Sequence, residues 1–212
     1  AGDAELLIVA AMLDGEEGSP GGSGGPTPAL FLVESKAAGI GVSAEPAMGV
    51  RAAATGTVTF QDVHLPAGAL LGAGSPDVYE QCVALSRIGW CSLAVGCGRA
   101  VLDYVIPYVK DRIAFGEPIS NRQGVAFTVS NIAIELDGMR LSTLRAAARA
   151  DAGLPFAREA TLARRLCAER GMQIGSDGVQ MLGGHGYVKE HPVERWYRDL
   201  RAAGVMEGVL VV

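Results

Sequence analysis

The sequence predicts an α+β fold in which a β region is followed by an antiparallel bundle of helices. Short apolar runs of strand length fill the first seventy residues. From about Asp77 onward, apolar residues recur at spacings of three and four, which is the period of an amphipathic helix. With 212 residues and 49% hydrophobic content, the chain can bury a sizeable core. We therefore expect a β domain over residues 1–75 and a helical domain over residues 76–212.

Strands are expected at residues 6–10 and 29–33, and in TVTFQDVHLP, which begins with the alternating pair Val58 and Phe60. Between the first two runs lies DGEEGSPGGSGGPTP, which is too rich in Gly, Pro and Ser to pack. We expect this segment to form a long mobile hairpin loop. Pro66 and the glycines that follow it end the β region.

The first two helices are indicated by apolar residues along one face of each. In the first segment these are Cys91, Val95, Gly98, Leu102, Val105 and Val109. In the second segment they are Val125, Val129, Ile132, Leu136 and Met139. Tight connections between long helices imply that neighbours run antiparallel.

A third helix is expected over about residues 155–182, because Pro155 and the glycine pair at 183–184 are common helix boundaries. One of its faces carries small residues, namely Cys167, Gly171, Ile174, Gly178 and Met181. Such a face lets a neighbouring helix approach closely, and we expect it to suit a closely packed subunit contact. A shorter fourth helix is expected from about Pro192.

Charge and hydropathy exclude several classes of partner. The net charge of −5 argues against a nucleic acid, which requires a basic patch. No run of Lys and Arg marks an acidic membrane surface as a partner. The apolar stretch at 88–101 contains Arg99 and is shorter than the ~20 residues that a bilayer requires. We therefore expect no nucleic acid and no membrane among the partners.

The cysteines and histidines do not predict a metal site. Cys82, Cys91, Cys97 and Cys167 lack the CxxC spacing of metal ligands, and no carboxylate or cysteine spacing joins the three histidines to a ligand set. Small thiols of this kind are ordinary core residues, and we expect a reduced, cytoplasmic protein. The opening AGDAELLIVA has no basic start and no initiating Met, so we expect no signal peptide and a longer parent chain.

A single acid interrupts the apolar end of the sequence, RDLRAAGVMEGVLVV. Glu207 is flanked by Met206 and, after Gly208, by further apolar residues. A carboxylate is expensive if it is buried without a partner, whereas an exposed one is only a polar break. The residue alone leaves both interpretations open, because perturbed carboxylates mark functional sites only statistically.

Several stretches in this order resemble the acyl-CoA dehydrogenase family of flavoproteins. They are MGVRAAATGTVTFQDVHLP with GALLG, then SRIG, DRIAFGEPISNRQ, QMLGGHGYVKEHPVERWYRDL and MEG, over about residues 44–208. The resemblance implies the second half of that family's β domain followed by its C-terminal helical domain. Members of the family also carry an N-terminal helical domain and the first part of the β domain.

The resemblance implies that FAD is the cofactor and that it is bound between subunits of a homodimer or homotetramer. The matching cofactor residues are Arg112, Phe115, Gln123, Gln180, Gly183 and Gly184. Taken alone, the position of Arg112 favours a cation that satisfies a helix C-terminus, although a guanidinium also suits a pyrophosphate. Gly183 and Gly184 alone are equally a helix C-cap, although backbone without Cβ atoms admits a flat group.

For Glu207 the resemblance implies the role of catalytic base. The base removes the proton alpha to a thioester carbonyl while a hydride passes from the beta carbon to flavin N5, giving an enoyl-CoA. Apolar surroundings would raise the proton affinity of such a carboxylate. In the family, the backbone N–H of this glutamate also donates to the thioester oxygen, and Gly208 leaves room for the substrate. Some relatives place the base where this sequence has Ser86, which cannot serve.

Two departures from the family pattern keep alternatives open. Arg87 matches an arginine that helps to hold CoA, but the usual acid three residues earlier is Ala84. After Gly208 the sequence has Val209 and Leu210, where the family usually has hydroxyl residues that reach the flavin. The alternatives are a dehydrogenase acting on an acyl carrier protein, an acyl-CoA oxidase, and a non-catalytic subunit that completes a partner's flavin site.

The enzyme that the resemblance implies is an acyl-CoA dehydrogenase of fatty acid metabolism. Its expected partners are the acyl-CoA substrate and an electron-transfer flavoprotein or similar acceptor. Because no GxGxxG motif follows a strand, a Rossmann-type dinucleotide site is not expected, and scattered contacts from two chains would hold the flavin.

Overall fold

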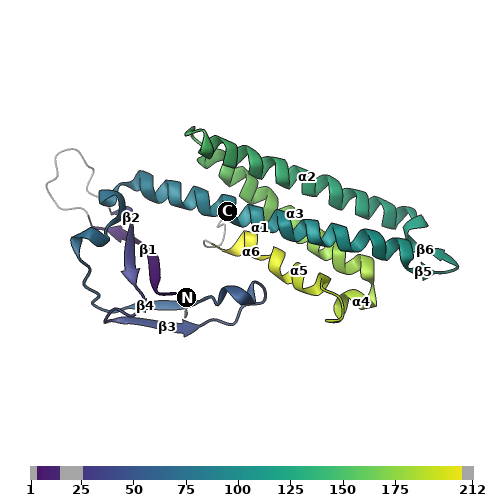
Figure 1. The fold of residues 1–212 in the computed structure, drawn as a ribbon, viewed down its shortest axis with the longest axis horizontal. Helices are drawn as coiled ribbons and strands as arrows, with labels where there is room; N and C mark the ends of the chain where they lie inside the picture. The colour runs from purple at the N-terminus through teal and green to yellow at the C-terminus, as the bar shows by residue number, and fades with distance from the viewer. Residues whose placement is uncertain (1–3, 15–25, 207–212) are drawn as a thin grey trace. The chain divides into compact units, whose positions relative to one another are not determined.

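The computed structural model describes residues 4–14 and 26–206 of the chain. By its internal contacts the chain divides into two compact units, Ala1–Val83 and Ala84–Val212. The first unit contains paired strands and the start of the longest helix, and the second is helical (Figure 1). The α+β class predicted from the sequence is confirmed.

The first unit is built on two antiparallel strand pairs. Strand β1 (Leu6–Leu13) pairs with β2 (Thr27–Glu34), and β3 (Ile40–Ala44) pairs with β4 (Gly56–Phe60). The hairpin expected from the two apolar runs is therefore confirmed, while most of its Gly-rich connection lies outside the described residues. Strand β3 was not expected, because IGVSA has too few apolar residues to form a recognisable pattern.

Three short 3-10 turns lie in the connections, one between β3 and β4 and two between β4 and the longest helix. They are η1 (Arg51–Ala53), η2 (Ala67–Ala69) and η3 (Leu71–Gly74). The buried side chains of β2 give this unit its small core, since Ala29, Leu30 and Val33 are each at most 6% exposed.

The second unit is a bundle of three long helices and several short ones (Figure 1). The long helices are α1 (Pro76–Asp111), α2 (Gln123–Asp151) and α3 (Ala157–Leu182). The short elements are β5 (Ile113–Ala114), β6 (Glu117–Pro118), η4 (Ile119–Asn121), α4 (Gly184–Tyr187), α5 (Val193–Leu200) and α6 (Ala202–Val205). The predicted helices are present, and the third and fourth begin one or two residues after the predicted positions.

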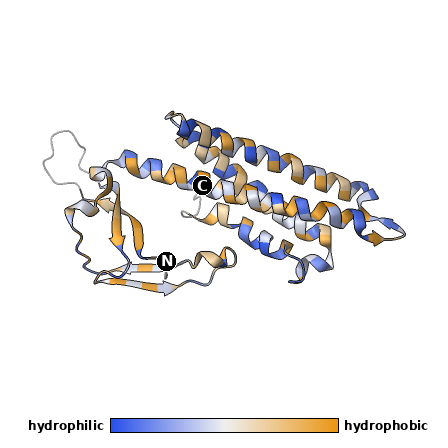
Figure 2. Cartoon of the chain, in the orientation of Figure 1, coloured by the Kyte–Doolittle hydropathy of each residue, from blue (hydrophilic) through white to orange (hydrophobic). Residues whose placement is uncertain are grey.

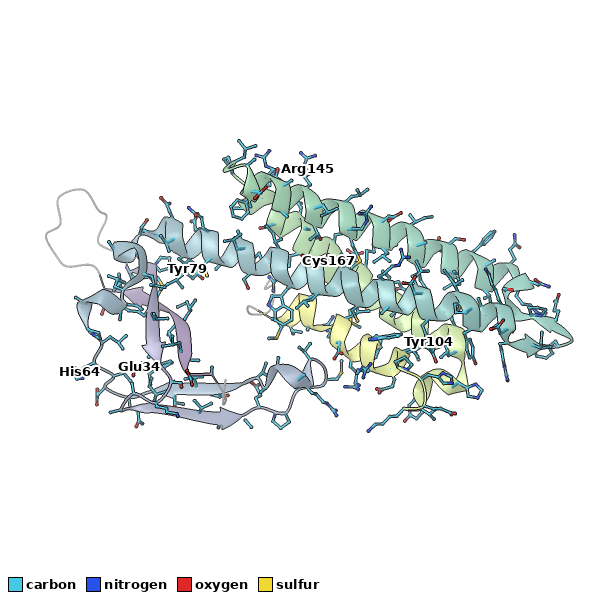
Figure 3. All side chains as sticks on the ribbon, in the orientation of Figure 1. Glu34, His64, Tyr79, Tyr104, Arg145 and Cys167 are labelled. Carbon is cyan, nitrogen blue, oxygen red and sulfur yellow. The ribbon has the colours of Figure 1, made fainter. Side chains whose placement is uncertain are left out.

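The apolar faces predicted for the helices form one continuous core. Apolar and polar residues alternate along each long helix (Figure 2). Cys91, Val101 and Val105 from α1 meet Met139 from α2 and Cys167 from α3 in this core, and each is fully buried. Figure 3 labels Cys167 among the packed helices. At its edge, burial and then the nearby Asp199 raise the pKa of the Cys97 thiol to about 12, so this thiol stays protonated.

The small-residue face of α3 is covered by helices of the same chain. A Cβ atom at Gly178 would lie 2.6 Å from Val101 Cγ1 of α1, and one at Gly175 would lie 3.0 Å from Tyr197 Cα of α5. The expected close approach of neighbouring helices is therefore confirmed. The expected use of this face in a subunit contact is wrong, because α1 and α5 already occupy it.

Among the described residues, no helix combines the length and the apolar character that crossing a bilayer requires.

The close packing at Gly178 leads to a stability prediction. Gly178→Ala places a methyl group against Val101, and such overpacking lowers the free energy of unfolding by about 1–3 kcal/mol. Gly138→Ala in α2 is the matched control, because no atom lies within 4 Å of the added Cβ and alanine favours helix by up to ~1 kcal/mol. Chemical unfolding of both variants measures the difference. An equal rise in stability for both would show that α1 does not approach α3 as described.

Candidate functional site

A surface groove with a volume of about 560 Å³ lies where α1 and α3 end and α2 begins. Such a volume falls in the range of about 300–1,000 Å³ that is typical of small-molecule sites. The β5–β6 hairpin and α4 lie at this same end of the bundle (Figure 1). The lining residues are Tyr108, Arg112, Phe115, Ile119, Arg122, Val125, Gln180, Met181, Leu182, Gly183, Gly184 and His185.

The hairpin that follows α1 fixes the backbone of Arg112. Its N–H donates to the carbonyl oxygen of Tyr108 at 2.9 Å, and its own carbonyl accepts from the N–H of Ile119 at 2.9 Å. The guanidinium is exposed and forms no ion pair within the described part of the chain. An arginine whose backbone is fixed and whose guanidinium N–H groups face solvent is suited to bind an anion such as a phosphate through two hydrogen bonds.

Phe115 lies at the tip of this hairpin with an exposed ring and an unfavourable backbone conformation. Its side chain is 94% exposed, and its backbone has φ of 60°, a left-handed conformation that is costly for a residue with a Cβ. The guanidinium carbon of Arg122 lies 5.3 Å from the centre of its ring, within the distance of a cation–π contact. Strain and exposure together indicate that the ring is held there to contact something else.

The second arginine of the groove is partly neutralised. Arg122 Nη2 lies 3.5 Å from Glu117 Oε1, and Asn121 Nδ2 donates to Glu117 Oε2 at 3.1 Å. Because this ion pair is exposed, it contributes little to stability. Its effect is to leave Arg112 as the uncompensated charge of the groove, so the groove attracts anions.

The opposite wall is the end of α3. The N–H of Gly183 donates to the carbonyl of Gln180 at 3.0 Å, and Gly183 has φ of 57°, which closes the helix as a glycine C-cap. A Cβ at Gly183 or Gly184 would meet no atom within 4 Å, so packing within the chain does not exclude side chains there. The left-handed conformation explains why position 183 is a glycine. At position 184 the glycine leaves the backbone uncovered by a side chain beside the groove.

A row of aromatic and histidine side chains supports this wall. The hydroxyl of Tyr108 lies 3.2 Å from His185 Nδ1, and the hydroxyl of Tyr104 lies 2.7 Å from His191 Nδ1. Tyr104, labelled in Figure 3, also packs edge-on against Trp196 at 5.7 Å between ring centres. The row ties α1 to the turn after α3 and so fixes the width of the groove.

The structure brings together five of the six cofactor residues expected from the sequence. Arg112, Phe115, Gln180, Gly183 and Gly184 line one groove, although they come from segments about 70 residues apart in the sequence. Gln123 begins α2 and is exposed beside the groove without lining it. Their binding of a cofactor stays a prediction.

Sequence reasoning missed Arg122, Tyr108 and His185 as groove residues. Tyr108 stands one helical turn before Arg112, so the helical period could have placed it on the same face. Arg122 directly precedes Gln123, but nothing in the local pattern showed that it would lie over Phe115. His185 follows a glycine pair in the sequence, and in the structure its ring holds the hydroxyl of Tyr108.

A second cluster, which we name the C-terminal clamp, consists of Arg87, Thr161, Arg164 and Met206. Arg87 Nη1 donates to Thr161 Oγ1 at 2.8 Å, and Arg164 Nη2 donates to the carbonyl of Met206 at 2.7 Å. Thr161 and Arg164 are neighbours on α3 because they are three residues apart. The clamp places Arg87 in the same cluster as the residue that immediately precedes Glu207.

Glu207 and Gly208 lie outside the described residues, so their predicted roles stay predictions. Arg164 was not expected as a site residue. Its burial could have been predicted, because residues 164, 167, 171 and 174 share the spacing of the small-residue face of α3. A charged residue in that row is 3% exposed and therefore must be satisfied within the protein.

The groove and the clamp lie far apart along the long helices. Arg87 and Arg112 are 25 positions apart on α1, which corresponds to ~37 Å of helical rise. Arg164 and Gln180 are 16 positions apart on α3, or ~24 Å. One chain therefore presents its two clusters at well-separated places.

Comparison with known proteins identifies relatives of this chain. Residues 72–210 match the family model described as the C-terminal domain of acyl-CoA dehydrogenases. A similar curated protein is the mitochondrial short-chain specific acyl-CoA dehydrogenase of Bos taurus, with 37% identity over 185 residues. That match covers 86% of this chain but only 43% of the bovine protein, so the chain spans less than half of its relative.

Solved structures show the same fold. The butyryl-CoA dehydrogenase of Megasphaera elsdenii matches with a TM-score of 0.86 and 29% identity, covering 98% of this chain and 54% of that one. A chain in the structure of the electron transferring flavoprotein of Acidaminococcus fermentans matches with a TM-score of 0.86 and 28% identity, covering 98% and 54%.

The strained position of Phe115 leads to a prediction that separates stability from binding. Phe115→Gly relieves the left-handed backbone and is more stable than Phe115→Ala by about 1 kcal/mol in chemical unfolding of the cofactor-free protein. Both variants lose the ring, so a groove that holds flavin, as proposed below, retains less of it after gel filtration in both, by roughly tenfold. Equal stability of the two variants, or undiminished flavin in both, would contradict the role given to Phe115.

Proposed function

Because this chain belongs to the acyl-CoA dehydrogenase family, we propose that the protein catalyses FAD-dependent α,β-dehydrogenation of an acyl-CoA thioester to the trans-2-enoyl-CoA. The observation that carries this proposal is the convergence of Arg112, Phe115, Gln180 and the glycine pair on one groove. These residues match the family's FAD contacts in sequence, and they line one groove although they lie far apart along the chain.

The chemistry of the groove fits FAD. The uncompensated guanidinium of Arg112 suits the pyrophosphate, and the open backbone at Gly184 admits a flat or anionic group. Phe115 offers an exposed ring to a nucleotide or to a neighbouring chain. The oxidised flavin, when bound, supplies the acceptor for the hydride that leaves the beta carbon.

In this proposal Glu207 takes the proton alpha to the thioester carbonyl. Its N–H donates to the carbonyl oxygen, where negative charge develops as the proton leaves. Arg87 contributes to holding CoA, and Gly208 leaves space for the thioester. The clamp supports these roles, because it joins Arg87 through α3 to the residue before Glu207.

The separation of groove and clamp supports an oligomeric enzyme. At ~37 Å along α1, the groove of one chain is far from its own Arg87, so a cofactor in that groove would serve the substrate site of a neighbouring subunit. The outer face of α2 supports this as well. It exposes Phe127, Ile134 and Leu141, each by at least 59%, at seven-residue spacing. We propose that a second copy of the chain covers this face in a homodimer or homotetramer.

An electron-transfer flavoprotein or similar protein is the proposed acceptor of the electrons. The likeness to a chain in the structure of the electron transferring flavoprotein of Acidaminococcus fermentans supports this assignment. The short-chain relatives support testing short acyl-CoA substrates first.

The central test is Glu207→Gln in the full-length protein with butyryl-CoA and an artificial electron acceptor. Loss of the base lowers kcat by roughly 10³-fold, because glutamine cannot accept the proton. Flavin content is the control and stays unchanged, since the substitution leaves every residue of the groove in place. Turnover within a few-fold of wild type would refute the catalytic role and favour the non-catalytic subunit.

An aerobic assay without added acceptor separates the dehydrogenase from the oxidase. A dehydrogenase reduces its flavin once and then stops, so little hydrogen peroxide accumulates. Peroxide formed in step with the enoyl-CoA product would overturn the assignment of a protein acceptor and leave the dehydrogenation chemistry intact.

A further inference from the structure

We propose that a second groove, between the end of α2 and the start of α3, binds the phosphate of a small organic molecule. This groove, which we name the arginine groove, has a volume of about 330 Å³. Its lining residues are Ser142, Arg145, Arg158, Glu159 and Leu162. The inference goes beyond the proposed function and does not depend on it, because none of these residues has a part in that function.

Two arginines supply the positive charge of the arginine groove. Arg145 and Arg158 are exposed, and neither forms an ion pair or a hydrogen bond with the described part of the chain. The other arginines of α2 differ, since Arg140 and Arg149 lie 3.8 Å and 3.5 Å from carboxylate oxygens. Figure 3 labels Arg145 where α2 approaches the start of α3. The N–H groups of both guanidinium groups are therefore available to an anion.

A serine hydroxyl on the same wall is also available. On α2, the hydroxyls of Thr128, Ser130 and Thr143 each donate to the backbone carbonyl four residues earlier, at 2.8 Å, 2.9 Å and 2.8 Å. Ser142 is half-buried and has no hydrogen bond within the residues that the structure describes. Because Ser142 and Arg145 are three positions apart, they share one face of α2. A hydroxyl and a guanidinium on one face can donate to the same anion.

The acidic lining residue, Glu159, is compensated within the chain. Its carboxylate lies 3.5 Å from Nε of Arg149, and its side chain is 12% exposed. The same Nε donates to the carbonyl of Pro155 at 2.7 Å, which holds Arg149 beside the carboxylate. Since Arg149 balances Glu159, positive charge remains in excess in the arginine groove, and the groove attracts anions.

The lining favours a phosphate monoester as the ligand. Such a group carries about 1.5–2 negative charges at pH 7, and its oxygens can accept hydrogen bonds from guanidinium groups on two helices at once. Leu162, which is 51% exposed, offers apolar surface to the organic part of the molecule. The volume lies near the lower end of the ~300–1,000 Å³ that is typical of small-molecule sites, which suits a ligand of the size of a nucleoside monophosphate.

The arginine groove lies far from the groove that Arg112 lines. Val125 of that first groove is 20 positions from Arg145 along α2, which corresponds to ~30 Å of helical rise. The arginine groove also differs from the clamp, in which Thr161 of α3 accepts a hydrogen bond from Arg87 of α1. A phosphate bound between α2 and α3 therefore does not occupy the proposed cofactor site.

Calorimetric titration of the full-length protein, as purified, with adenosine 5′-monophosphate in about 150 mM salt tests this proposal. We expect a Kd below about 1 mM and no binding of adenosine, which lacks the charge. Arg145→Gln and Arg158→Gln each weaken binding about tenfold, because each variant loses a charge-assisted hydrogen bond. Circular dichroism checks that both variants fold, as expected for substitutions of exposed side chains.

Arg165→Gln is the matched control, because Arg165 is an exposed arginine of α3 that does not line the arginine groove. Its affinity for the nucleotide stays within about twofold of the unchanged protein, since distant charges are screened at this salt concentration. Arg112→Gln behaves in the same way, because Arg112 lines the other groove. Arg145→Lys keeps the positive charge without the fork of the guanidinium and restores part of the binding.

Four results would overturn the proposal. One is an equal loss of affinity in Arg165→Gln, which would mean general attraction to surface charge. Another is a loss confined to Arg112→Gln, which would place the phosphate in the first groove. A third is adenosine binding as tightly as its monophosphate. The last is no binding to the unchanged protein; if Arg145→Gln then also lowers the mass of an oligomer in solution, this arginine serves a contact with a second copy of the chain.

Discussion

The packing of α1 and α5 against α3 is the constraint on which the candidate site depends. Glycines along α3 remove side chains that would otherwise hold the neighbouring helices away, as the 2.6 Å approach at Gly178 illustrates. Because the core is packed as densely as a molecular crystal, the close spacing at the glycines also fixes the spacing of the helices further along their length. The C-terminal end of α3 then forms one wall of the groove, and its N-terminal half holds the carbonyl of Met206 through Arg164.

The two ends of α3 therefore perform different tasks on one rigid element. At one end the uncompensated charge of Arg112 faces a bare backbone, which is a place for an anion. Toward the other end, the guanidinium of Arg164 donates a hydrogen bond to a backbone carbonyl inside the protein. The guanidinium group thus has two uses in this chain. Where it is exposed it can bind an anion, and where it is buried it holds a backbone carbonyl in place.

Much of the fold could be predicted from the sequence because its signals are local. The apolar runs predicted β1 and β2, and Pro155 with Gly183 predicted the limits of α3 to within two residues. Strand β3 was not predicted, because its pairing with β4 and not its own composition stabilises it. In the site, motif resemblance identified Arg112 and Gln180, whereas the part played by Arg122 and Arg164 depends on neighbours that are distant in sequence.

The hairpin tip at Phe115 has a consequence for the life of the protein in a cell. If the proposed oligomer and cofactor are missing, a subunit presents this ring, and the exposed Phe127, Ile134 and Leu141 of α2, directly to water. Such surfaces attract chaperones, proteases and other unfolded chains. In the proposed enzyme, a defect in cofactor supply or in assembly would therefore lower the amount of the polypeptide before it lowered the measured rate.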